Sequence, residues 1–145
     1  YLLASRGTVV GVISIAGYLG LPARTGYSAS KYAVRGFLDT LRVENLKTGL
    51  HVLVAAPGFT ASNIRNAALT SHGEAQGESP RDEKKMMSAE TVAKKIADAV
   101  TKRKSELILT FIEGKLSVFL KKFFPSLVER LTYNHMAKEI NSPVK

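Results

Sequence analysis

The sequence predicts an α/β fold built on a parallel sheet. Three observations lead to this prediction: two apolar, β-branched segments at residues 7–15 and 50–56, and a segment of helical periodicity between them. Parallel strands need a long crossover, which is usually a helix, so this order favours two neighbouring parallel strands. Ligands of such sheets bind beyond the carboxyl ends of the strands. We therefore expect the functional residues where these two strands end.

The first half of the chain contains the clearest elements. Residues 7–15 (GTVVGVISI) show little alternation, which is typical of a strand covered on both faces. Residues 28–46 carry apolar side chains three and four positions apart, and they predict an amphipathic helix. Residues 50–56 (LHVLVAA) predict a second buried strand, which the Pro57-Gly58 turn closes.

The second half begins with a polar stretch, residues 67–88, which lacks periodicity. We interpret it as a mobile loop over the substrate, with a disordered linker as the alternative. Ser88 is predicted to be the N-cap of a helix that has Glu90 in its first turn and runs to about Lys102. Residues 107–112 (LILTFI) then predict a third strand.

Residues 115–133 keep helical spacing and present a large apolar face, with Pro125 breaking the run. We expect this face to pack on the domain or on a subunit partner, and contact with a membrane surface is the alternative. Because the chain opens on Tyr1 and turns apolar almost at once, we expect it to begin inside a larger fold. Residues 1–113 would form the C-terminal half of a single domain, and residues 114–145 would be a helical extension.

Composition excludes several classes of function. The chain has no cysteine, so it has no disulfide and no thiolate chemistry, and its three histidines lack the spacing of metal ligands. The net charge of +9 is spread along the chain, which favours a solvated surface or attraction for a phosphorylated cofactor over nucleic-acid binding. The apolar residues 8–23 are too few to span a membrane, and nothing else indicates export, so we expect a cytoplasmic protein.

A tyrosine and a lysine at the start of the predicted helix are candidates for acid–base catalysis. Tyr27 and Lys31 are four positions apart, so their side chains share one face of the helix. An ammonium at that distance favours the phenolate and is expected to lower the pKa of the tyrosine. Ser14 ends the first strand, and the loop after it is long enough to return Tyr27 to the same crevice.

A serine at a strand end also occurs in serine hydrolases. The nucleophile elbow of those enzymes needs glycines two positions before and two after the serine. Here these positions hold Val12 and Ala16, which excludes this reading.

Three motifs together, GTVVGVISIAG, YSASKYAV and VLVAAPGF, resemble the short-chain dehydrogenases/reductases in their classical form. The resemblance covers residues 1–62 closely and 88–133 loosely. It implies a Rossmann-like, doubly wound parallel sheet, of which this chain would be the C-terminal, catalytic half. It also implies an NAD(P)-dependent oxidoreductase that interconverts a carbonyl and an alcohol, with NADP slightly favoured over NAD.

The same resemblance assigns roles to individual residues. Tyr27 would be the general acid and base, Lys31 would hold the nicotinamide ribose, and Ser14 would orient the substrate oxygen. The remaining cofactor contacts would come from Pro57, Gly58, Thr60 and Ser62, although the family commonly has an apolar residue and a threonine at the last two positions. Ile15 and Tyr18 would line the substrate site, and for Tyr18 an anchoring role in the core is equally compatible with the sequence.

The substrate is expected to be a medium-sized apolar ketone, aldehyde or alcohol, because no anion clamp is visible. The resemblance further implies a homo-oligomer, in which the small residues Ala29, Ala33 and Gly36 would allow two helices to approach closely. The alternative function is a non-catalytic scaffold that keeps the fold and meets a partner or membrane through its apolar, basic tail.

Overall fold

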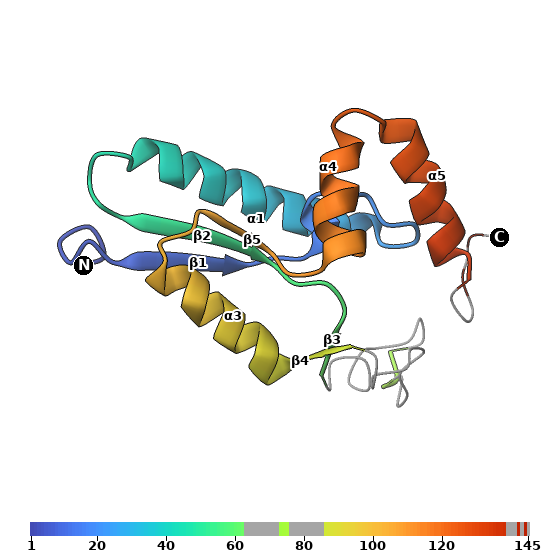
Figure 1. Cartoon of the computed structure of the whole chain (residues 1–145), viewed down its shortest axis with the longest axis horizontal. Coiled ribbons are helices and arrows are strands. Elements are labelled where there is room, and N and C mark those ends of the chain that lie inside the picture. Colours follow the sequence, from blue (N-terminus) through green and yellow to red (C-terminus); the bar gives the residue numbers. More distant parts are fainter. Residues whose placement is uncertain (63–72, 76–85, 139–141, 143, 145) are drawn as a thin grey trace.

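The computed structural model describes residues 1–62, 73–75, 86–138, 142 and 144. Its main sheet has three parallel strands in the order β1 (Thr8–Val12), β2 (His51–Ala56) and β5 (Glu106–Ile108). Helix α1 (Thr25–Glu44) covers one face of this sheet and α3 (Ala89–Thr101) covers the other, as Figure 1 shows. The predicted doubly wound α/β fold is therefore confirmed.

The remaining elements lie beyond the carboxyl ends of these strands. Two short strands, β3 (Thr60–Ala61) and β4 (Met87–Ser88), pair in parallel. The chain after β5 forms a π-helical segment η3 (Phe111–Leu116), then α4 (Ser117–Lys121) and α5 (Pro125–Met136). Helices α4 and α5 stand at the end of the sheet on the side of α1 (Figure 1). Most of the predicted loop 67–88 lies outside the described residues.

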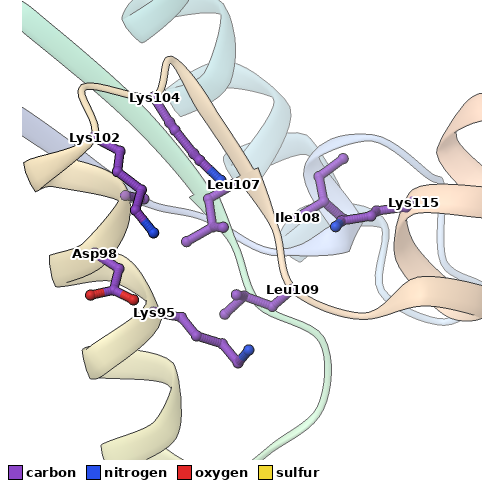
Figure 2. A pocket seen from close by; sticks show the side chains of 9 residues that line it. Lys95, Asp98, Lys102, Lys104, Leu107, Ile108, Leu109 and Lys115 are labelled. Atoms are coloured by element: carbon purple, nitrogen blue, oxygen red, sulfur yellow. The ribbon is translucent and has the colours of Figure 1, made fainter.

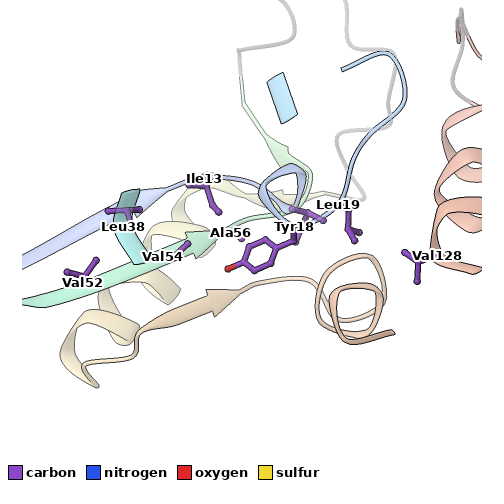
Figure 3. Close-up of a cluster of buried hydrophobic side chains, with 9 residues drawn as sticks. Ile13, Tyr18, Leu19, Leu38, Val52, Val54, Ala56 and Val128 are labelled. Carbon is purple, nitrogen blue, oxygen red and sulfur yellow. The ribbon is translucent and has the colours of Figure 1, made fainter. Parts of the chain in front are cut away.

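Strand β2 is the centre of the fold, and all six of its residues are buried. Because side chains alternate along a strand, Val52, Val54 and Ala56 face α1, where they join Leu38 in the main core cluster (Figure 3). Leu53, which is fully buried, points to the opposite face, where α3 packs against β2. The continuous apolar sequence of this strand therefore reflects cover on both faces.

The prediction that the first strand is covered on both faces is wrong for β1. Val10 is 37% exposed and Val12 is 53% exposed. Because side chains alternate along the strand, both point away from α1, to the face of the sheet on which α3 lies. Helix α3 packs against β2 on this face and leaves β1 largely uncovered. Strand β1 pairs only with β2 within the described residues, so it lies at the edge of this sheet.

The predicted strand at residues 107–112 is also partly wrong. Strand β5 ends at Ile108, and Phe111 and Ile112 belong to η3. The backbone N–H of Lys115 donates to the carbonyl oxygen of Thr110 at 3.0 Å, which closes the π-helical turn. A Cβ atom on Gly114 would lie 2.6 Å from Thr110 Oγ1, so glycine allows the chain to fold back tightly here.

Two helix ends follow the predictions. Ser88 is the N-cap of α3, and its Oγ accepts a hydrogen bond from the backbone N–H of Thr91 at 3.2 Å. Glu90 lies in the first turn, where a hydrogen bond from its own backbone N–H and one from the Ser88 hydroxyl lower its pKa. Pro125 begins α5 at a position where its missing N–H is tolerated, so the helical run divides there as expected.

The C-terminal helices bury only part of their apolar surface. Val128 and Met136 are buried, and Val128 joins the core cluster. Several large apolar side chains nevertheless stay exposed: Phe111, Ile112, Leu116, Phe119, Phe123, Phe124, Leu127 and Leu131. Packing on the domain therefore accounts for one side of the predicted apolar face and leaves the other uncovered. No helix in the described part of the chain is both long enough and apolar enough to cross a membrane.

Candidate active site

Ser14 follows the end of β1 and caps the short 3-10 turn η1 (Ile15–Gly17). Its Oγ accepts a hydrogen bond from the backbone N–H of Ala16 at 3.2 Å. This contact uses a lone pair of the hydroxyl and leaves its proton available for a bound oxygen. Ser14 is only partly buried, so its side chain is also accessible to a ligand.

The turn that Ser14 opens lies directly against α1. A Cβ atom on Gly17 would be 2.8 Å from Ile13 Cδ1 and 3.2 Å from the carbonyl oxygen of Lys31. Glycine at this position therefore allows the backbone of η1 to approach the backbone of α1. The structure thus brings the Ser14 turn against the helix that carries the other two predicted catalytic residues.

Tyr27 and Lys31 lie in the first turns of α1, on one face as the spacing predicts. The Nζ atom of Lys31 is 5.5 Å from the centroid of the Tyr27 ring, within the range of a cation–π contact. The Tyr27 side chain is 47% exposed. Neither the Tyr27 hydroxyl nor the Lys31 ammonium uses its protons in a hydrogen bond to another described residue, so both can bind a ligand.

Segment 57–62 leaves the carboxyl end of β2 and leads into β3. A Cβ atom on Gly58 would lie 2.6 Å from Thr110 Cγ2, so this turn packs tightly against the segment after β5. The Thr60 hydroxyl donates to the carbonyl oxygen of Gly58 at 3.2 Å, and Ser62 is exposed. The segment therefore lies at the predicted edge of the sheet, and its part in cofactor binding stays a prediction.

Ile15 and Tyr18, the other predicted substrate contacts, are both buried. Ile15 belongs to the core cluster. The Tyr18 hydroxyl donates to Glu106 Oε1 at 2.6 Å, and Arg35 lies over the Tyr18 ring with Cζ 3.8 Å from its centroid. These contacts correspond to the anchoring role of Tyr18, and its part in substrate binding stays a prediction.

The environment of Tyr18 has a consequence for stability at high pH. Burial, and next the hydrogen bond to Glu106, raise the pKa of Tyr18 above its ordinary value of 10.0. The folded state therefore holds this proton more tightly than the unfolded state does. The contribution of the protonated Tyr18 hydroxyl to stability is fully present below about pH 10, and it is lost as the pH rises through the pKa of Tyr18 in the folded state.

We expect Tyr18→Phe to destabilise the complete polypeptide by about 1 kcal/mol at neutral pH, because one hydrogen bond is lost. The same variant should lose less stability than the unaltered protein as the pH rises above about 10, because the titrating group is gone. Urea unfolding at a series of pH values measures both effects. Glu106→Gln is the matched control, since it keeps an acceptor but removes the charge. An unchanged alkaline loss in Tyr18→Phe would contradict this account.

Three residues near the site are not marked as functional by any motif in the sequence. Lys121 of α4 and Tyr32 of α1 both contact the backbone of Tyr18. Thr110 lies between Gly58 and Gly114, and its buried Oγ1 has no hydrogen-bond partner among the described residues. Tyr32 could have been noticed as the neighbour of Lys31, and Lys121 as a cation within an apolar run.

A basic pocket of about 230 Å³ lies elsewhere, between α3 and β5 (Figure 2). Four lysines and one acidic residue are among the side chains that line it: Lys95, Asp98, Lys102, Lys104 and Lys115. None of the predicted catalytic or cofactor-binding residues belongs to this pocket. It is therefore distinct from the candidate active site.

The histidines and carboxylates do not form a metal centre in the described part of the chain. His51 is buried between two strands, where its Nδ1 faces the Thr8 hydroxyl at 3.2 Å and its Nε2 faces the carbonyl oxygen of Lys104 at 2.9 Å. Because a carbonyl oxygen can only accept, Nε2 carries the proton. The role of His51 in the fold is thus structural.

A parallel sheet with helices on both faces, and a serine turn packed against the helix that carries a tyrosine and a lysine, form a Rossmann-like, doubly wound fold. The protein-family model described as short chain dehydrogenase matches residues 1–72 of this chain. The chain belongs to the short-chain dehydrogenase/reductase family.

Curated relatives and solved structures agree with this family. The chain is 33% identical over 137 residues to dehydrogenase/reductase SDR family member 7B of Mus musculus, covering 94% of this chain and 42% of the relative. It is 31% identical to the dehydrogenase/reductase SDR family protein 7-like of Dictyostelium discoideum, and the match covers 97% of this chain and 42% of that protein. The chain therefore spans less than half the length of these relatives.

The solved structures share the fold at lower sequence identity. A short chain dehydrogenase from Burkholderia cenocepacia in complex with NADP has a TM-score of 0.67 at 19% identity, covering 90% of this chain and 49% of that one. One from Sphingobium yanoikuyae in complex with NADPH has a TM-score of 0.59 at 15% identity, covering 99% and 50%. These likenesses confirm the Rossmann-like architecture.

Proposed function

We propose that the complete protein is an NAD(P)-dependent oxidoreductase that interconverts a carbonyl and an alcohol. The observation that carries this proposal is the placement of Ser14, Tyr27 and Lys31. The Ser14 turn packs against the helix of the other two, and all three side chains keep polar protons available for a ligand. Membership in the family supports the same reaction class.

The donors in this site match a nicotinamide nucleotide. The Lys31 ammonium and the Tyr27 hydroxyl can donate to the ribose hydroxyls, and both side chains lie on an accessible face of α1. Residues Pro57, Gly58, Thr60 and Ser62 would border the nicotinamide ring at the carboxyl end of β2. We favour NADP over NAD, in keeping with the NADP and NADPH complexes of the two solved relatives and with the net charge of +9.

In the direction of reduction, a nicotinamide held by Tyr27 and Lys31 would supply the hydride for the carbonyl carbon. Ser14 donates a hydrogen bond to the carbonyl oxygen and fixes its position. Tyr27 transfers its hydroxyl proton to that oxygen as the negative charge develops there, which completes the alcohol. The Lys31 ammonium stabilises the phenolate that remains, until solvent returns a proton to it. In the direction of oxidation, the Tyr27 phenolate accepts the proton of the alcohol.

The substrate class is proposed from the same surroundings. Among the described residues that are assigned to the candidate site, Lys31 is the one cation, and it is assigned to the cofactor. A medium-sized apolar ketone, aldehyde or alcohol therefore fits better than an anion. The test is the oxidation of NADPH and NADH by the complete polypeptide with a panel of apolar ketones and aldehydes. Turnover supports the proposal, whereas cofactor binding without turnover on any member of the panel supports a non-catalytic scaffold.

We also propose that the complete protein is a homo-oligomer that pairs through α1. The small residues Ala29, Ala33 and Gly36 are exposed on this helix, and Phe37 beside them is 65% exposed. An apolar helix face with small residues allows another helix to approach closely. Light scattering on the complete polypeptide measures the mass in solution, and a monomer would contradict this proposal.

A further inference from the structure

The backbone carbonyl of Tyr18 is held by two helices at once. Its oxygen accepts a hydrogen bond from the Tyr32 hydroxyl of α1 and another, at 2.8 Å, from Lys121 Nζ of α4. The same Nζ atom also donates to the Tyr32 hydroxyl oxygen at 2.9 Å. These three groups, which we call the Tyr18 clamp, close a triangle between η1, α1 and α4.

The side chain of Tyr18 is also held by contacts with two elements. Arg35 of α1 covers its ring, and Glu106 of β5 accepts the hydrogen bond of its hydroxyl. Lys121 makes charge-assisted contacts, which are stronger than neutral ones, and it is itself only partly exposed. Tyr18 is therefore a fixed point at which segments from η1, α1, α4 and β5 meet.

This fixed point lies at the far end of the turn that Ser14 opens. Ser14 is the N-cap of η1 and Tyr18 is its C-cap. The backbone N–H of Tyr18 donates to the carbonyl oxygen of Ile15 at 2.9 Å, and that of Leu19 donates to the same oxygen at 3.0 Å. On the other side of the clamp, Tyr32 directly follows Lys31. The clamp thus links the Ser14 turn to the helix that carries Tyr27 and Lys31.

We propose that Lys121 is a positioning residue for catalysis. Through the carbonyl of Tyr18 and the hydroxyl of Tyr32, it fixes the Ser14 turn relative to α1, and so sets where Ser14 holds the substrate oxygen in relation to Tyr27. The C-terminal helices, about a hundred residues further along the chain, thereby take part in the geometry of the site. This inference rests on the proposed function.

The test compares Lys121→Met with Lys122→Met in the complete polypeptide. The two lysines are neighbours on α4 and its C-cap, but Lys122 is exposed and outside the clamp. We expect Lys121→Met to lower kcat by about 10- to 100-fold, since small misplacements of a reacting group have effects of this size. The Kd of the cofactor and the unfolding midpoint should stay close to those of Lys122→Met. Lys121→Arg, which keeps a charged donor, should recover part of kcat.

Hydrogen exchange gives a readout that does not depend on activity. The amides of Gly17, Tyr18 and Leu19 are bonded within the turn, so loosening it should speed their exchange in Lys121→Met and leave it unchanged in Lys122→Met. Tyr32→Phe, which removes a second member of the clamp, should act in the same direction.

The inference is overturned if Lys121→Met and Lys122→Met have the same kcat and the same exchange in the turn. It is also overturned if kcat falls only in proportion to the folded fraction, because Lys121 would then serve stability alone. If the unaltered polypeptide shows no turnover, the proposed function fails. The exchange rates then still decide whether the clamp fixes the Ser14 turn.

Discussion

Tyr27→Phe is expected to lower turnover of the complete polypeptide by about 10²- to 10⁴-fold, the usual contribution of a positioned acid or base. The substitution removes only the hydroxyl, which has no hydrogen bond to another described residue. The fold should therefore be unchanged, and Lys31 should still bind the ribose. Steady-state kinetics and a cofactor titration on the same preparation separate the two effects.

The matched control for this variant is Tyr133→Phe, which removes a hydroxyl from α5 outside the candidate site. It should keep the turnover of the unaltered protein. Normal turnover in Tyr27→Phe would exclude Tyr27 as the general acid and base. A loss of cofactor binding as large as the loss of turnover would instead indicate that its main role is to hold the nucleotide.

The second large effect concerns the contact between β1 and α1. A Cβ atom on Gly11 would lie 2.0 Å from Leu38 Cδ1, and Leu38 is only 3% exposed. We expect Leu38→Ala to lower the free energy of unfolding by about 2–5 kcal/mol, and Gly11→Ala to lower it by about 1–3 kcal/mol through overpacking. The double variant should lose less free energy of unfolding than the two single variants together, because the methyl group added at position 11 occupies the space that the Leu38 side chain leaves.

Urea unfolding of the four proteins in this cycle measures the coupling, which we expect to be about 0.5–3 kcal/mol in favour of the double variant. Gly26→Ala is the control, because a Cβ atom there would meet no atom within 4 Å. It should leave stability unchanged or raise it by up to about 1 kcal/mol. Strict additivity of Gly11→Ala and Leu38→Ala would show that the two side chains do not compete for this space.

The sequence predicted the elements whose signal is local. Strand β2 has an apolar residue at nearly every position, and α1 has regular apolar spacing, so each was located to within a few residues. The stretch LILTFI was misjudged because its apolar residues cannot show that Gly114 and Thr110 fold the chain into a π-helical turn. The exposure of Val10 and Val12 likewise depends on which strand lies at the edge, and a segment's own sequence does not contain that information.

The residues of the candidate site likewise divide into those that a local sequence signal predicts and those that only tertiary contacts reveal. Ser14, Tyr27 and Lys31 could be proposed because a strand end and a helical spacing of four residues place them in one region. The roles of Tyr32 and Lys121 could not, since the contacts of Lys121 join residues that are up to 103 positions apart. For Tyr18 the sequence left the anchoring role as one of two alternatives. Such contacts arise only when α4 packs against the end of the sheet.

The measurement that tests the central claim most directly is the transfer of deuterium from a reduced nicotinamide deuterated at C4. The complete polypeptide would be incubated with this cofactor and a prochiral apolar ketone, and the alcohol would be examined by mass spectrometry. We predict one deuterium on the carbinol carbon of the product, with the oxygen proton taken from solvent through Tyr27. Binding of the cofactor without the formation of a deuterated alcohol from any ketone tested would contradict the account and indicate a fold that has kept its site without turnover.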